Sequence, residues 1–203
     1  RWDVNLGTLD STALVVDGAT LAIDGLASVT LDGSLAIAQI TPDGETQARY
    51  TAIKMGDVNV SASTPTPGAF AVDGTLTIDE LDYNHAADGF DRLDWNTALD
   101  LDDDGFIDLV DPGADLTPPV VLTINLPDTL HYRVNGNVTS TDANTPLLTA
   151  GPVTITGSAD FALSRWDVNL GTLDSTALVV DGATLAIDGL ASVTLDGSLA
   201  IAQ

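Results

Sequence analysis

Residues 1–39 read RWDVNLGTLDSTALVVDGATLAIDGLASVTLDGSLAIAQ. Apolar and polar side chains alternate through this segment, beginning with Trp2, Val4 and Leu6. A period of two is typical of β-strands that bury one face. The same alternation continues beyond residue 150, with only short interruptions. We therefore predict an all-β fold made of short antiparallel strands.

Ten Asp-Gly pairs punctuate the alternating segments, and the first three begin at Asp17, Asp24 and Asp32. Asp-Gly suits backbone positions with positive φ, which occur both in tight hairpin turns and in β-bulges. The spacing of seven or eight residues is compatible with a tight meander, or with longer strands bent by bulges. The sequence leaves both interpretations open.

The opening 39 residues return without a difference at positions 165–203, an offset of 164 residues. Duplicated segments drift apart, so identity over this length indicates recent amplification within a tandem array. We expect residues 1–164 to form one full repeat and residues 165–203 to begin the next. The sequence is then a window of a longer array of such repeats.

Acidic residues dominate the charge, with 30 Asp and Glu against 6 Lys and Arg, a net charge of −24. Without a basic patch, the chain is not expected to bind nucleic acid. No apolar run approaches the 18 residues of a membrane-spanning helix, so membrane insertion is not expected either. Cys is absent, which excludes disulfides and thiolate metal sites.

Residues 90–99, FDRLDWNTAL, form the one segment with helical spacing of its apolar residues. Phe90 and Leu93 are three residues apart, and Trp95 and Leu99 are four apart. Such pairs lie on one face of a helix. We predict one short helix here, directly before an unusual acidic segment.

That acidic segment, residues 100–111, reads DLDDDGFIDLVD and has the spacing of a twelve-residue calcium loop. Oxygen donors would stand at loop positions 1, 3, 5, 7, 9 and 12, and Gly105 at position 6 would permit the sharp turn. Several carboxylates this close repel one another unless a cation lies among them. We predict a structural Ca²⁺ site whose ligands are Asp100, Asp102, Asp104, the backbone carbonyl of Phe106, Asp108 and Asp111.

The twelve residues resemble the loops of EF-hand and dockerin proteins, including the branched aliphatic Ile107 at position 8. Two features depart from that pattern. Asp111 is shorter than the usual Glu at position 12, and Pro112 with Pro118 and Pro119 disfavours an outgoing helix. The resemblance therefore implies an isolated calcium loop.

Other chemistry has little support in the sequence. His85 and His131 are the only histidines, and neither has a partner at metal-ligand spacing. No nucleophile elbow, phosphate loop or dinucleotide fingerprint is present, so we do not expect an enzyme. Trp2, its copy Trp166 and Trp95 could stack on sugars, although such residues more often lie in a core.

Exact tandem repetition, high Asp content, absent Cys and a calcium loop together resemble the extender regions of giant calcium-dependent bacterial adhesins of the RTX class. The resemblance implies a secreted or cell-surface protein, with each repeat adding a calcium-rigidified length to a fibre. The expected architecture is an elongated antiparallel sandwich or barrel-like module. A continuous β-ribbon or β-solenoid filament is the alternative.

The expected partners are neighbouring copies of the repeat, joined in tandem or by donation of residues 1–39 to another chain. A calcium-dependent module that binds glycans or another surface is the alternative function. It would require exposed aromatic residues near the calcium loop, where Phe90, Trp95 and Phe106 lie in the sequence.

Overall fold

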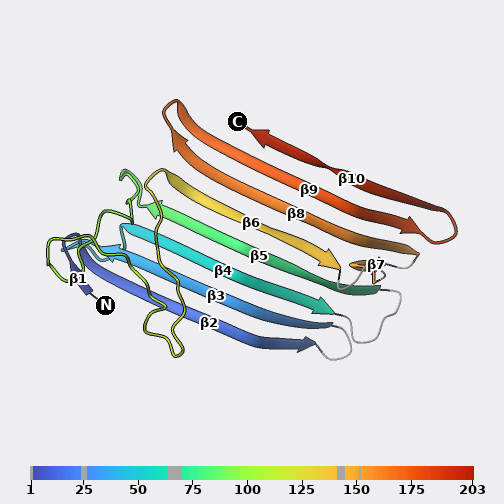
Figure 1. Cartoon of the computed structure of the whole chain (residues 1–203), viewed down its shortest axis with the longest axis horizontal. Helices are drawn as coiled ribbons and strands as arrows, with labels where there is room; N and C mark the ends of the chain where they lie inside the picture. The colour runs from blue at the N-terminus through green and yellow to red at the C-terminus, as the bar shows by residue number, and fades with distance from the viewer. Residues whose placement is uncertain (1, 24–26, 64–69, 141–144, 151) are drawn as a thin grey trace.

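The computed structural model of the chain describes residues 2–23, 27–63, 70–140, 145–150 and 152–203. Ten strands form one antiparallel sheet in the order β1-β2-β3-β4-β5-β6-β8-β9-β10, and the short β7 pairs with β5 and β8. The all-β, antiparallel prediction is confirmed (Figure 1). The strands are β1 (Trp2–Val4), β2 (Gly7–Ile23), β3 (Ala27–Thr41), β4 (Tyr50–Ser63), β5 (Phe70–Ala86), β6 (Leu130–Ser140), β7 (Leu148–Ala150), β8 (Val153–Val168), β9 (Gly171–Ile187) and β10 (Ala191–Ala202).

The described strands make a single open sheet, and not the sandwich or barrel that we expected. Each long strand pairs with the next long strand along the chain, so the sheet widens steadily and no second sheet forms. At one edge, the ladder between β1 and β2 covers only Gly7–Leu9 of β2. At the other edge, β10 pairs with β9 alone among the described strands.

The Asp-Gly pairs serve both of the purposes that the sequence left open. Asp17-Gly18 and Asp32-Gly33 lie inside long strands at shifts of register, where the Gly18 N–H donates to Asp32 Oδ1 at 2.5 Å. The second copy repeats this contact between Gly182 N–H and Asp196 Oδ1 at 2.7 Å. Asp188-Gly189 instead makes the turn between β9 and β10, with φ of +70° at the glycine. Its first-copy counterpart, Asp24-Gly25, lies outside the described residues.

Residues 87–129 connect β5 to β6 and cross one face of the sheet; we call this segment the cap (Figure 1). Its apolar side chains pack against small and aliphatic side chains of the sheet to form one buried cluster. Trp95, which is fully buried, is the largest member. The cluster contains Leu9, Ala36, Ala38, Ile40 and Ala52 from the sheet, Trp95, Leu99, Val110, Leu122, Ile124 and Leu126 from the cap, and Leu130 at the start of β6.

The short helix predicted over residues 90–99 is absent, and only a turn occurs there. Thr97 N–H donates to the Asp94 carbonyl at 3.2 Å within this turn, and other groups of the segment bond to more distant partners. Trp95 N–H donates to the Leu126 carbonyl at 2.9 Å, and the Leu93 carbonyl accepts from the Asn84 side chain at 2.9 Å. The spacing of Trp95 and Leu99 therefore reflects two side chains buried in the same core, and tertiary contacts override the local helical pattern.

Asn84 joins the sheet to the cap through three buried hydrogen bonds. Its Nδ2 group donates to the carbonyls of Leu93 and Pro127, both at 2.9 Å, while its Oδ1 accepts from Trp95 Nε1 at 3.1 Å. A side-chain amide has two donors and two acceptor positions, and Asn84 uses three of these four. Asn84 thereby fixes the position at which the indole of Trp95 lies on the sheet.

Beside Asn84, the same face of the sheet carries a fully buried carboxylate, Asp82. Arg133 Nη2 donates to Asp82 Oδ2 at 2.5 Å, and Lys54 Nζ lies 3.7 Å from Asp82 Oδ1. Lys54 also donates to the cap residue Asn125 at 3.0 Å. A buried carboxylate is strongly destabilising without a charged partner. Lys54 and Arg133, two of the six basic residues, supply that partner for Asp82.

We expect Asn84→Ala to lower the free energy of unfolding by about 2–3 kcal/mol, because it leaves buried polar groups of the cap without their partner. Urea denaturation followed by Trp fluorescence measures the change. His85→Ala is the matched control, since this neighbouring side chain is exposed and points away from the cap. Equal losses in the two variants would contradict the role assigned to Asn84.

Candidate metal centre and repeat junction

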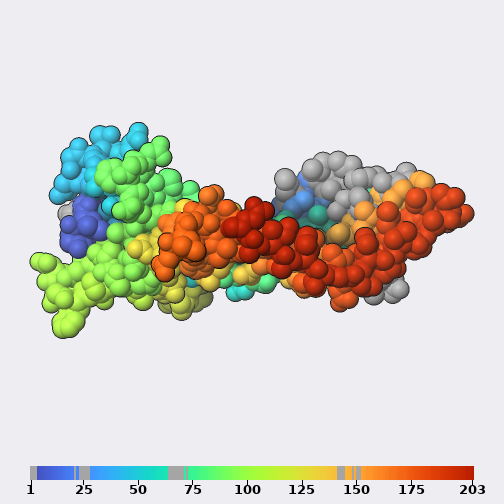
Figure 2. All heavy atoms as spheres, turned by 90° about the horizontal axis from the view of Figure 1, so that it is seen from above, coloured from blue at the N-terminus to red at the C-terminus, as the bar shows by residue number. Residues whose placement is uncertain are grey.

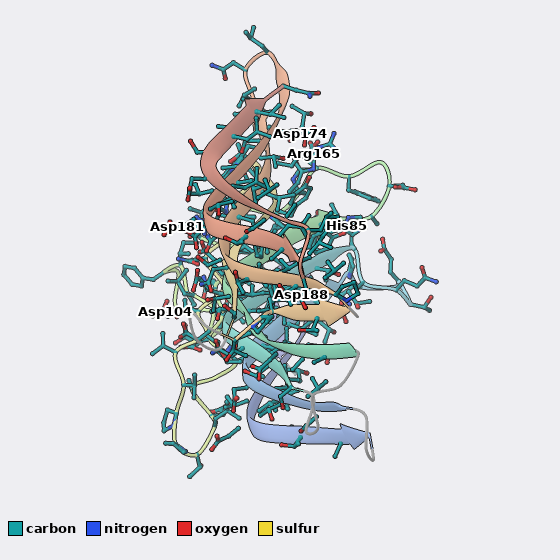
Figure 3. All side chains as sticks on the ribbon, turned by 90° about the vertical axis from the view of Figure 1, so that its right-hand side faces the viewer. His85, Asp104, Arg165, Asp174, Asp181 and Asp188 are labelled. Carbon is teal, nitrogen blue, oxygen red and sulfur yellow. The ribbon has the colours of Figure 1, made fainter. Side chains whose placement is uncertain are left out.

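The predicted calcium loop protrudes from the cap on a base that is tied together by backbone bonds. Asp108 N–H donates to the Leu99 carbonyl and Ile124 N–H to the Val110 carbonyl, both at 2.8 Å. Leu99 and Val110 are buried in the core cluster, so the two ends of the loop are anchored. The residues between them are mostly exposed, and Figure 3 shows Asp104 on the opposite side of the sheet from His85.

Three of the predicted ligands converge inside this loop. One carboxylate oxygen each from Asp100, Asp102 and Asp108 lies within 4.8 Å of the other two. Asp100 is held by the N–H groups of Asp104 and Gly105, which donate to its two oxygens at 3.2 and 2.9 Å. The turn itself uses positive φ at Asp103 (+60°) and Gly105 (+86°), as a chain that folds back around a central point requires.

The convergence has an electrostatic cost. Partial desolvation, followed by the nearby charges of Asp104, Asp108 and Asp100, raises the pKa of Asp102 above its usual value. A raised carboxyl pKa means that the ionised form is disfavoured in the folded loop. A divalent cation bound among these oxygens would remove that repulsion, and hard carboxylate oxygens are the donors that Ca²⁺ prefers.

The remaining predicted ligands are placed differently. Asp104 Oδ1 accepts a bond from the Phe106 N–H at 2.8 Å, within the turn. Asp111 lies beyond the turn, where its Oδ1 accepts from the N–H groups of Gly113 and Leu122 at 3.1 and 3.0 Å. Its other oxygen accepts from Thr123 Oγ1 at 3.4 Å. Asp111 thus joins the end of the loop to the returning segment of the cap.

Three aromatic residues lie near the loop, and they differ in exposure. Trp95 is fully buried, and Phe90 is covered on one face by the Arg49 guanidinium, 4.1 Å from the ring centroid. Phe106 is 73% exposed, and Phe90 is 49% exposed. Trp166, the second-copy counterpart of Trp2, packs partly buried against the core cluster. Of the three aromatic residues that the glycan alternative names, Phe90 and Phe106 are exposed and Trp95 is buried, and the alternative stays a prediction.

A second polar site lies where one repeat ends and the next begins. Asp167, the third residue of the second copy, accepts hydrogen bonds from the Arg92 guanidinium of the cap and is 2.8 Å from His131 Nε2 on β6. Arg92 also approaches His131 Nδ1 at 3.0 Å. The His131 hydrogen bond is the main cause, with Arg92 adding to it, of a pKa for Asp167 below its usual range.

The sequence did not predict this junction site. The sequence gives His131 no partner at metal-ligand spacing and gives Arg92 no role. The one available signal was the scarcity of bases, because six Lys and Arg among 30 Asp and Glu have many carboxylates with which to pair. Sequence spacing does not show which carboxylate pairs with each basic residue. Arg92 and Asp167, for example, are separated by 75 residues.

No protein-family model, curated protein or solved structure matches this chain. Among the residues that the structure describes, no helix is long and apolar enough to cross a membrane.

We expect Asp167→Asn to lower the melting temperature at pH 7, and the difference from the wild type to shrink as the pH falls. A carboxyl whose pKa is lower in the folded than in the unfolded chain stabilises the fold at pH values above its unfolded pKa of about 4. That contribution is lost as the pH decreases through the lower folded-state pKa. Circular dichroism melts from pH 7 to pH 2 measure the effect. Asp160→Asn, an exposed change on the same strand, should show no such pH dependence.

Proposed function

We propose that this chain is a structural repeat whose units join edge to edge into one continuous antiparallel ribbon, stiffened by calcium. The observation that carries the proposal is the way in which the second copy of the 39-residue segment extends the sheet. β9 pairs with β8 from Val153 to Val168, so the segment that begins a repeat continues the sheet of the preceding one. No gap or linker separates the two repeats.

The two copies also fold alike, which a repeating ribbon requires. Leu14 pairs with Leu35 between β2 and β3, and their counterparts Leu178 and Leu199 pair between β9 and β10. The register shifts near Gly33 and Gly197 also coincide. Since the same residues form the same hairpin at both edges, the next repeat can continue from β10 as this one continues from β3.

The geometry favours a broad ribbon over a slender stalk. One period contributes six long strands, β2 to β6 and β8, to the sheet. Neighbouring strands are about 4.8 Å apart, so a repeat adds roughly 29 Å of length. Strands of 17 residues, at about 3.3 Å per residue, give a width near 56 Å. The strands would then run across the fibre, as in the ribbon alternative drawn from the sequence.

Calcium would act on this ribbon through the cap. One period carries 25 acidic and 5 basic residues, a net charge of −20, after the 5 acids and 1 base of residues 165–203 are subtracted from the totals. Neighbouring repeats therefore repel one another strongly. A cation held by Asp100, Asp102 and Asp108 would reduce the charge and order the loop at its anchored base.

The cellular setting follows from the resemblance to adhesin extender regions, and it belongs to the same proposal. Free calcium is plentiful outside cells, so a weak carboxylate site of this kind would be filled there. A secreted or cell-surface bacterial fibre is the setting that combines these features. Neighbouring copies of the repeat are its principal partners.

For arrays of increasing repeat number, we expect a constant length increment of about 29 Å per 164 residues. Negative-stain electron microscopy of chains with two, four and eight periods measures this slope. A continuous ribbon also predicts a constant width. Separate beads, or increments that vary from one repeat to the next, would contradict the edge-to-edge arrangement.

For the calcium site, we expect millimolar CaCl₂ to raise the melting temperature of the 203-residue chain above its value in EDTA. At a calcium concentration about a hundredfold above the dissociation constant, binding adds roughly 2.7 kcal/mol of stability. Asp102→Asn should abolish most of this gain. In EDTA the same variant should melt at or above the wild-type temperature, because it removes a carboxylate whose pKa is raised by desolvation and by the neighbouring charges.

Asp115→Asn provides the matched control, because it removes one exposed charge from the same cap at a distance from the three converging carboxylates. The control should retain the full calcium response. A wild-type melting temperature that is the same in calcium and in EDTA would contradict the role of calcium. The ribbon proposal would then be supported by the strand pairing alone.

A further inference from the structure

Lys54 is the only lysine in the sequence, and it lies where the cap meets the sheet. On β4 it stands between Ala36 of β3 and Asp82 of β5, which are its partners in the two neighbouring ladders. Its Nζ donates a hydrogen bond to Asn125 Oδ1 of the cap at 3.0 Å. The one side-chain amine of the chain is therefore held against an amide group of the segment that covers the sheet.

Asn125 is held in place by its two neighbours in the cap. Ile124 and Leu126 are both buried in the core cluster. The Ile124 N–H donates to the Val110 carbonyl at 2.8 Å, and the Leu126 carbonyl accepts from the Trp95 N–H at 2.9 Å. Because both neighbours are anchored, the backbone of Asn125 is fixed and its amide stays beside the amine.

Asp82 brings a carboxylate to the same amine. Its side chain is fully buried, and Arg133 Nη2 donates to its Oδ2 at 2.5 Å. Its Oδ1 lies 3.7 Å from Lys54 Nζ and has no hydrogen-bond partner among the residues that the structure describes. Buried polar atoms are seldom left without a hydrogen bond, so this oxygen requires an explanation. A buried acceptor that faces an amine is suited to taking a proton from it.

The amine is also close to the carbon atom of the amide. Lys54 Nζ is 3.0 Å from Asn125 Oδ1, and a C=O bond is about 1.2 Å long, so Nζ lies at most about 4.2 Å from Cγ. Groups react readily when their atoms are held about 3–3.5 Å apart, a distance that a small rotation of the lysine side chain would reach. The site therefore places a nucleophile, an electrophile and a proton acceptor together.

We propose that Lys54 Nζ and Asn125 Cγ form an amide bond within the chain and release ammonia. Asp82 Oδ1 takes a proton from the Lys54 ammonium, and the neutral amine attacks Cγ while the C=O electron pair moves onto the amide oxygen. The C=O bond then re-forms and the bond from Cγ to Nδ2 breaks. Nδ2 keeps the electron pair of that bond, takes up the proton held by Asp82 and one from Nζ, and leaves as NH₄⁺. One ammonium ion replaces another and Asp82 is again a carboxylate, so atoms and charge balance.

The bond fastens the cap to the sheet. It joins two residues that are 71 positions apart, and a cross-link over so long a loop strongly restricts the unfolded chain. Figure 2 shows the cap, in yellow-green, gathered at one end of the molecule. Arg133 still balances Asp82 once Lys54 has lost its charge. The inference goes beyond the proposed function, and in an array it adds one covalent bond to each repeat.

The mass of the folded chain tests the inference directly. The intact wild-type protein should be lighter than its sequence mass by about 17 Da, the mass of one ammonia molecule. Trypsin should leave residues 50–92 joined to residues 93–133, because it does not cleave after an acylated lysine. Tandem mass spectrometry of the joined peptides should locate the link at Lys54 and Asn125.

Lys54→Arg is the decisive variant, because it keeps a positive charge beside Asp82 but replaces the amine with a guanidinium that stays protonated. It should fold, have its full sequence mass and yield the two peptides separately. Asp82→Asn removes the proton acceptor, and should slow formation of the bond after refolding at least about a hundredfold.

Asn135→Gln is the matched control, since Asn135 precedes Gly136 and can lose ammonia by cyclising on its own backbone. This variant should keep both the mass deficit and the joined peptides. A folded wild-type chain with its full sequence mass, or a deficit that persists in Lys54→Arg, overturns the inference. Neither result would affect the strand pairing or the calcium response, so the proposed function is tested separately.

Discussion

The burial of small residues beneath the cap is the constraint on which the rest of this molecule depends. A single layer of sheet has no second sheet to cover either face, so another segment has to exclude water. Here residues 87–129 do so, over the alanines of β3 and β4, with Trp95 held in place by Asn84. The predicted calcium loop and the contact between Arg92 and Asp167 both belong to this segment.

The cap also relates one repeat to its neighbour. Arg92 in the cap and His131 on β6 both contact Asp167, which already belongs to the next copy. Trp166, one residue earlier, packs partly against the core under the same cap. A repeat boundary drawn from the sequence at residue 165 therefore falls inside a packed region, and the two repeats share a core as well as a sheet.

In the fibre that we propose, calcium and strand pairing would address different problems. Strand pairing supplies length, because backbone hydrogen bonds are indifferent to the sign of the side-chain charges. The carboxylates that keep such a polymer soluble also repel one another, most closely where Asp100, Asp102 and Asp108 converge. A cation bound at this place would lower the repulsion without using any of the few basic side chains, and those described are already in ion pairs.

The alternation of Trp2, Val4 and Leu6 was enough to predict an all-β, antiparallel chain, because side chains of a strand point to opposite faces in turn. The loop spacing also predicted that Asp100, Asp102 and Asp108 lie close together, since residues of a tight turn are close in sequence, whereas their role as calcium ligands stays a prediction. Only the tertiary structure decided that the sheet is single and that residues 90–99 are not helical. It alone paired Asp167 with Arg92 and left Ala200 exposed where Ala36 is buried. These outcomes depend on residues far apart in the chain, and identical local sequence cannot distinguish a covered copy from an uncovered one.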